Sequence, residues 1–214
     1  MEPSWVRQIG QILMKNLWID LETTGLDVKK HGVVQIAGIV EIDGEVAESF
    51  NFYTKPLRGD GITKRSMEVN HFDLDTIKGF PEAEGVKYQL LDIFKKYVDP
   101  YYKNDKFFLM GYNAKFDYDF LRRWFEKQSF QYFGAYFWFP PVDVMNLGAL
   151  ATLTSRKELP NFKLMSVAKA FGVRLDETLL HDAHYDIKIT RELFYKLMET
   201  LSDGRDHKQN GRPT

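Results

Sequence analysis

Cysteine is absent from this 214-residue chain. The absence excludes a disulfide scaffold, thiolate zinc sites and a cysteine nucleophile, and it suits a reducing, intracellular (cytoplasmic) location. No apolar run reaches about 18 residues, so the sequence predicts no membrane span. The N-terminal segment also lacks the apolar stretch of a secretory signal.

An excess of one charge is missing as well. The 29 Lys and Arg residues nearly balance the 30 Asp and Glu residues, for a net charge of -1. This balance provides no global basic field for wrapping long duplexes, although a local basic groove can exist within a neutral total. With 44% hydrophobic residues, the chain has the composition of one ordinary globular domain.

The ends of the chain differ from its middle. We expect residues 1–15 to form a short leader and residues 16–201 to form the folded domain. Residues 202–214 contain no apolar side chain, which predicts a disordered tail.

Apolar patterning predicts strands over residues 16–22, 32–42 and 46–53, and Asp43-Gly44 is a hairpin signal between the last two. The chain is therefore expected to open with a three-stranded antiparallel meander. A polar loop is expected at residues 56–64.

Helices and strands alternate in the second half. The sequence predicts helices over residues 82–98 and 142–153 and a long terminal helix from Ala183 to Leu201. Two further helices are expected, one that begins after Asn113 as its cap and one that ends before Gly172. Strands are predicted over residues 106–112 and 136–139. This order favours an α/β domain with a mixed sheet.

Two carboxylates lie at the end of the first predicted strand. Because strand side chains alternate, Asp20 and Glu22 share one face, roughly 7 Å apart, and Leu21 faces the other way. Such a pair repels unless a cation lies between the two acids, and Mg²⁺ prefers oxygen ligands. Taken alone, the pair is better explained by solvated acids at a strand end.

Two further acids begin helices. Asp117 lies in the first turn of one predicted helix, and Asp186 lies in the first turns of the terminal helix, five residues after His181. The helix dipole explains each acid separately. It does not explain why four acids and a histidine all lie at the ends of elements.

Three motifs carry a resemblance to a known family. Asp20-Leu-Glu-Thr-Thr-Gly25 resembles the first motif of the DEDD 3'–5' exonuclease superfamily, residues 113–117 (Asn-Ala-Lys-Phe-Asp) resemble the second, and residues 181–186 (His-Asp-Ala-His-Tyr-Asp) resemble the third motif of the DEDDh subgroup. Relatives include polymerase proofreading subunits, oligoribonuclease, ribonuclease T and the TREX nucleases. Three motifs in order are far more specific than one, and the resemblance covers residues 17–201.

The resemblance implies a ribonuclease H-like fold, a mixed five-stranded sheet flanked by helices, and a role for each matching residue. Asp20, Glu22, Asp117 and Asp186 would hold two Mg²⁺ or Mn²⁺ ions, and His181 would take a proton from the attacking water. The remaining implied contacts are with substrate: Thr23 and Thr24 at the 3'-OH, Leu26 as a wedge beside the last base, and Asn113.

The implied activity is a metal-dependent 3'–5' exonuclease that releases nucleoside 5'-monophosphates from single-stranded 3' ends, with DNA slightly favoured over RNA. The alternative is a catalytically idle nucleic-acid-binding module of the same fold. A homodimer and association with a polymerase both remain open.

Several residues depart from the family pattern. Tyr112 stands where many relatives have His, and His184 is a second histidine beside the third motif. Asn70 and His71 resemble a histidine-containing segment near the family's active site, with Phe72 in place of the usual Gly.

Two clusters have competing interpretations. Core packing claims most of the aromatic residues, but the run at residues 132–141 is too dense to be wholly buried, so it is expected to form an interface or a shelf for substrate. Four cations on one predicted helix are either phosphate ligands or a solvated face: Lys115, Arg122, Arg123 and Lys127.

Overall fold

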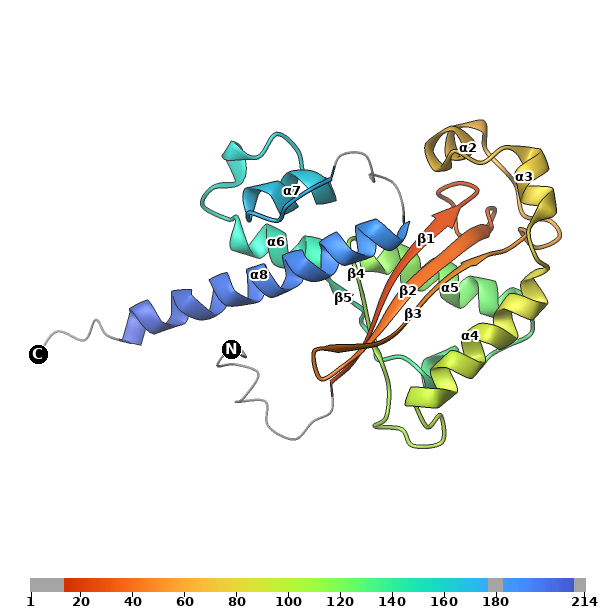
Figure 1. The fold of residues 1–214 in the computed structure, drawn as a ribbon, viewed down its shortest axis with the longest axis horizontal. Coiled ribbons are helices and arrows are strands. Elements are labelled where there is room, and N and C mark those ends of the chain that lie inside the picture. Colours follow the sequence, from red (N-terminus) through yellow and green to blue (C-terminus); the bar gives the residue numbers. More distant parts are fainter. Residues whose placement is uncertain (1–13, 177–182, 210–214) are drawn as a thin grey trace, which may run out of the picture.

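A mixed five-stranded sheet lies at the centre of the molecule, with helices on both faces (Figure 1). The computed structural model describes residues 14–176 and 183–209, and of residues 203–209 it gives the backbone alone. The strand order is β3-β2-β1-β4-β5. The strands are β1 (Lys15–Thr23), β2 (Val33–Ile42), β3 (Glu45–Tyr53), β4 (Phe108–Gly111) and β5 (Val142–Asp143). The predicted α/β fold with five strands is confirmed.

The helices form two layers. On one face lie α4 (Ala83–Tyr97) and α5 (Ala114–Lys127), and on the other lie α6 (Val144–Ala151), α7 (Leu164–Ala170) and α8 (Ala183–Gln209). Two short helices, α2 (Lys64–Asn70) and α3 (Leu74–Gly79), lie beyond one end of the sheet (Figure 1). The sequence patterns predicted neither α2 nor α3, because these helices bury almost no apolar side chain.

The first three strands form the predicted antiparallel meander. Asp43 and Gly44 both have positive φ, as the two-residue hairpin turn between β2 and β3 requires. The strand β4 pairs with β1 in the parallel direction, so the carboxyl ends of β1 and β4 meet at one edge of the sheet. That edge carries the first two acidic motifs.

Side chains of β1 alternate between two cores, as predicted. Leu17, Ile19 and Leu21 pack with α4 and α5, whereas Trp18 packs with α6, α7 and α8. Asp20 and Glu22 share the parity of Trp18, so they lie on the face that α8 covers.

A buried polar network fixes α8 across the sheet. The Glu41 side chain is fully buried and accepts hydrogen bonds from Tyr195 Oη (2.7 Å) and Asn16 Nδ2 (2.8 Å), and it forms an ion pair with Arg191. A buried carboxylate needs such partners to offset its desolvation. The network holds α8 in register with β2 and thereby sets the position of Asp186.

The strand predicted at residues 136–139 is wrong. Phe137 forms only an isolated bridge with Phe107, and the fifth strand is Val142–Asp143, inside the segment predicted as helix. Tyr136 ends a turn of 3₁₀ helix, η1 (Phe133–Ala135), and the prolines at 140 and 141 cannot donate to a ladder. The pairing therefore starts only after them.

The predicted ends of the domain have different outcomes. Helix α8 continues to Gln209, so residues 202–209 are helical where composition predicted a disordered tail. Extending an existing helix is far cheaper than starting one, so a polar segment can follow an anchored helix. Residues 1–13 of the predicted leader and residues 210–214 lie outside the described residues. In the described part of the chain, no helix is long and apolar enough to cross a bilayer.

Candidate active site

The carboxylates of the first and third motifs lie across from each other. Asp20 and Glu22 end β1, Asp186 occupies the first turn of α8, and all three side chains are partly buried. The negative charge of Asp186 acts on Glu22 directly. The structure thus brings together acids that lie far apart in the sequence.

Asp117 joins this group from the opposite face of the sheet. Its side chain is only 4% exposed, and its Oδ1 atom accepts a hydrogen bond from the Leu21 backbone N–H at 3.0 Å. The bond ties the first turn of α5 to β1 between Asp20 and Glu22. The second motif is therefore held against the first by a direct contact.

Burial and mutual repulsion make these acids reluctant to ionise. Burial, followed by the charge of Asp186, raises the pKa of Glu22 from 4.5 to about 7. Burial also raises the pKa of Asp117 well above its usual value, and the charges of Glu22 and Asp143 add to the effect. A single acid with a purely structural role has no need to be buried beside other acids that raise its pKa.

The donor chemistry fits hard divalent cations. The described carboxylates come from β1, α5 and α8, offer only oxygen ligands, and repel one another without a cation. The described residues alone form no group of three or more acids or histidines that could hold a metal ion. The fit therefore depends on the type, burial and charge of the side chains.

The repulsion predicts that Glu22→Gln stabilises the metal-free protein. Because folding raises the pKa of Glu22 from 4.5 to about 7, the metal-free wild type loses stability as pH rises through that range. At pH 8 we expect a Tm several degrees higher for the variant, since a chain of this length gains about 2–4 °C per kcal/mol. At pH 4, where Glu22 is mostly protonated in both states, the difference should nearly vanish. Thermal unfolding in chelator at both pH values is the measurement, and equal wild-type and variant Tm at pH 8 would contradict it.

The turn after β1 is held by its own side chains. Thr23 Oγ1 donates to Gly25 O (2.9 Å), and Thr24 Oγ1 donates to Gly61 O (2.6 Å) while accepting from Gly32 N–H (2.8 Å). Both hydroxyl protons are therefore in use. These hydroxyls can therefore make the expected contact with a substrate 3'-OH only by accepting a hydrogen bond from it.

Leu26 lies at the tip of this turn and is 84% exposed, a position open to a base. Asn70, from the last turn of α2, donates through Nδ2 to Thr23 O at 3.0 Å. This contact gives Asn70 a positioning role for the turn, which the resemblance of residues 70–71 only suggested. His71 is the C-cap of α2 with φ 57° and is exposed.

Asn113 precedes α5 in the left-handed conformation, with φ 64°, and its side chain makes no capping hydrogen bond, contrary to the expected cap. Instead, its backbone N–H donates to Asp143 Oδ1 at 2.9 Å. The Asn113 side chain is exposed.

Asp143 is a residue that sequence reasoning missed. It caps α6 by accepting from Met145 N–H, and its charge raises the pKa of Asp117. The available signal was an acid directly before a helix. It was overlooked because the fifth strand was predicted in the wrong place.

The proposed general base, His181, lies outside the described residues. The rival His184 is described: it lies in the first turn of α8 and is partly buried, and its Nδ1 atom has no hydrogen-bond partner among the described residues.

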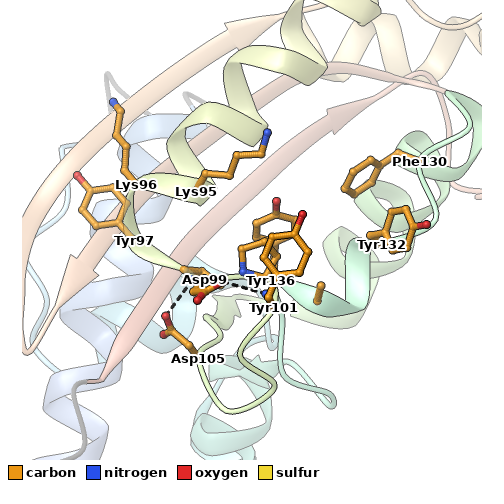
Figure 2. A pocket seen from close by; sticks show the side chains of 12 residues that line it. Lys95, Lys96, Tyr97, Asp99, Tyr101, Asp105, Phe130, Tyr132 and Tyr136 are labelled. Atoms are coloured by element: carbon orange, nitrogen blue, oxygen red, sulfur yellow. Dashed lines mark hydrogen bonds between the residues drawn. The ribbon is translucent and has the colours of Figure 1, made fainter.

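The aromatic run belongs mainly to the core. Phe133, Tyr136 and Phe137 are buried, whereas Tyr132 and Phe139 are exposed. Tyr132 and Tyr136 line an open cavity of about 1050 Å³ between the end of α4 and η1 (Figure 2). The cavity lies at the end of the sheet where β4 begins, away from the acids at its carboxyl end.

The basic cluster on α5 is neutralised by neighbouring acids. Lys115 pairs with Asp119, and Arg122 and Arg123 share Glu126. Lys127 forms an ion pair with the buried Asp60 and thereby holds the segment after β3. These pairs favour the solvated or structural interpretation over phosphate binding.

The fold and the acidic edge define a ribonuclease H-like nuclease domain. A model of the exonuclease family RNase_T matches residues 17–194, most of the chain, so the protein belongs to this exonuclease family. Its membership of the DEDD 3'–5' exonuclease superfamily, predicted from three motifs, is confirmed.

Relatives agree with this assignment. DNA polymerase III PolC-type from Halalkalibacterium halodurans is 26% identical over 184 residues, which cover 86% of this chain and 11% of the relative. The protein of the same name from Thermotoga petrophila is 26% identical over 183 residues, covering 86% and 12%. This chain therefore spans only about a tenth of the curated relatives it matches.

Solved structures establish the fold. E. coli Exonuclease I in complex with a dT13 oligonucleotide has a TM-score of 0.67 and 21% identity, with 87% of this chain and 41% of that chain covered. Another structure of exonuclease I has a TM-score of 0.69 and 20% identity, with coverage of 87% and 41%.

Proposed function

We propose that the protein is a metal-dependent 3'–5' exonuclease that removes nucleoside 5'-monophosphates from single-stranded DNA. The observation that carries the proposal is the convergence of Glu22, Asp117 and Asp186 from three elements, with the pKa of Glu22 raised by Asp186. A binding module has no need to bury acids that repel one another.

Each site residue has a specific task in this proposal. Asp20, Glu22, Asp117 and Asp186 hold two divalent ions, Mg²⁺ or Mn²⁺. When bound, such ions stabilise the attacking and leaving oxygens of an in-line displacement. His181 accepts the proton of the attacking water. The 5'-phosphate remains on the released nucleotide, and the new strand end carries a 3'-OH.

The β1 turn supplies recognition of the strand end. Thr23 and Thr24 lie beside the terminal 3'-OH, Leu26 stacks against the last base, and the exposed Asn113 side chain lies beside the scissile phosphate. The exposure of Leu26 and the internal hydrogen bonds of both threonines support a rigid turn with an apolar tip.

The relatives support DNA and a replication context. The curated relatives are DNA polymerases of the PolC type, and E. coli Exonuclease I was solved with a DNA oligonucleotide. We therefore propose DNA in preference to RNA, and association with a polymerase as the partner. No observation on this chain favours a homodimer.

The proposal is tested with 5'-labelled single-stranded DNA and RNA oligomers in Mg²⁺, in Mn²⁺ and in excess EDTA. We expect DNA to be shortened with either metal, RNA to be shortened more slowly, and EDTA to abolish both reactions. The same ions should raise the Tm, because a ligand that binds only the folded state stabilises it. Full activity in EDTA would contradict the metal mechanism, and tight binding of DNA without cleavage would indicate the idle module.

The position of Leu26 predicts which ends of a strand are degraded fastest. A terminal base pair must open before its base can reach the wedge, and opening costs a few kcal/mol. Single-stranded and frayed 3' ends should therefore be degraded faster than blunt duplex, as a ladder of shortened 5'-labelled strands. A 3'-phosphate should slow the reaction, and a blocked 5' end should not. Efficient cutting of a closed single-stranded circle would require an endonuclease and would overturn this prediction.

A further inference from the structure

The connection between α6 and α7, residues 152–163, carries a concentration of positive charge. Arg156, Lys157 and Lys163 are all exposed, and Glu158 is the one acid in the segment. Among the described residues, none of these three cations forms an ion pair, whereas the α5 cations are paired with acids. The segment therefore holds charge that is available to a ligand.

Contacts attach this connection to the active-site edge. Tyr112, which follows β4 and precedes Asn113, donates its hydroxyl to Phe162 O at 2.8 Å. The Arg156 guanidinium lies over the Phe162 ring, with Cζ 3.9 Å from the ring centroid. The Arg156 charge is felt at Tyr112, where it opposes the rise in pKa caused by burial and by Asp143. Arg156 is thus two contacts away from the second motif.

The connection lies on the opposite side of the acids from α2. In Figure 1, α2 and α3 lie beyond the end of β1 on one side, and α7 lies on the other side, with the start of α8 between them. Asn70 of α2 supports the turn proposed to hold the 3'-terminal nucleotide. A strand that runs from this turn across the acids would continue towards Tyr112 and the α6–α7 connection.

We propose that Arg156, Lys157 and Lys163 form a phosphate-binding track for the part of a single strand on the 5' side of the cleaved nucleotide. This inference rests on the proposed function and adds to it the path of the substrate. The Arg156 guanidinium is held over the Phe162 ring, so it meets a phosphate with less loss of side-chain freedom than a free arginine. Nearby, Leu153 is 72% exposed and offers an apolar surface to a base.

The test compares two double variants with equal loss of charge. Arg156→Gln/Lys163→Gln removes two track cations, and Arg122→Gln/Arg123→Gln removes two paired cations of α5 as the matched control. Binding of a fluorescent oligothymidylate is followed by anisotropy, with Ca²⁺ present, over a series of salt concentrations. For the track variant we expect affinity to fall about tenfold or more, since hydrogen bonds to charged groups are strong. The slope of log K against log salt should fall by about 1.4, for two phosphate contacts on a single strand.

Kinetic measurements distinguish the proposed phosphate-binding track from the active site. The track variant should raise KM for an oligomer with little change in kcat, and it should hydrolyse the p-nitrophenyl ester of thymidine 5'-monophosphate like the wild type, because one nucleotide does not reach the track. Arg156→Lys/Lys163→Arg should restore the salt slope. Equal effects of the track and control variants, or an unchanged salt slope in the track variant, would overturn the inference. Loss of affinity in the track variant alone, with a wild type that hydrolyses neither substrate, would leave the track standing and refute the proposed function.

Discussion

Asp20→Ala is expected to lower the single-turnover rate of strand shortening by several orders of magnitude, with the fold retained. Asp20 lies at the end of β1 beside Glu22, on the face covered by α8, where its carboxylate is proposed to be one of the metal ligands. Removing it would take one ligand away from the proposed metal site. The fold should be retained, because Asp20 lies near the end of β1 and its side chain is only partly buried.

The matched control is Asp119→Ala, which removes an acid two residues from Asp117 on the same helix. Asp119 pairs with Lys115 on the surface, and surface pairs contribute little to stability. This variant should cleave at close to the wild-type rate. Circular dichroism and the stabilisation produced by Mn²⁺ complete the comparison. A folded Asp20→Ala protein with near-wild-type activity would show that the family role does not transfer to this residue.

The acidic site was predictable because local rules place its members. Alternation along β1 puts Asp20 and Glu22 on one face, and the first turns of two helices place Asp117 and Asp186. Only the parallel pairing of β1 with β4 brings the second motif to the first, and that pairing is a long-range contact. The resemblance of the three motifs, in their order along the chain, predicted that the first two motifs meet, whereas the apolar pattern alone could not predict this contact.

The parts that sequence reasoning missed depend on long-range contacts. Asp143 gains its position from a two-residue strand, too short to show any periodicity, and from the backbone N–H of Asn113. The resemblance pointed to Asn70, but not to its contact with Thr23, because Asn70 lies on a helix with no buried residue, which no apolar stripe marks. Three of the four α5 cations, Lys115, Arg122 and Arg123, pair at ordinary i,i+3 and i,i+4 spacing that the sequence alone shows, whereas Lys127 pairs with the distant Asp60.

His181→Ala is expected to lose about two to four orders of magnitude in kcat, the usual share of general acid–base catalysis. The binding of metal and strand should survive, because His181 is proposed to act on the attacking water and not as a ligand. The measurement is kcat for an oligomer over a series of Mn²⁺ concentrations up to saturation, together with anisotropy for strand binding. An activity loss that excess Mn²⁺ reverses would make His181 a ligand.

His184→Ala is the matched histidine variant and should lose much less activity. In a helix each residue turns by about 100°, so His184 points roughly 200° away from Asp186 around the axis of α8. Its Nδ1 atom is buried without a hydrogen-bond partner among the described residues, a position that fits packing better than proton transfer with solvent. The predicted order is therefore a large loss of kcat for His181→Ala and a small loss for His184→Ala, with the latter lowering Tm. A residue that only packs against its neighbours affects stability before it affects kcat. The reverse order of activities would therefore assign the role of general base to His184.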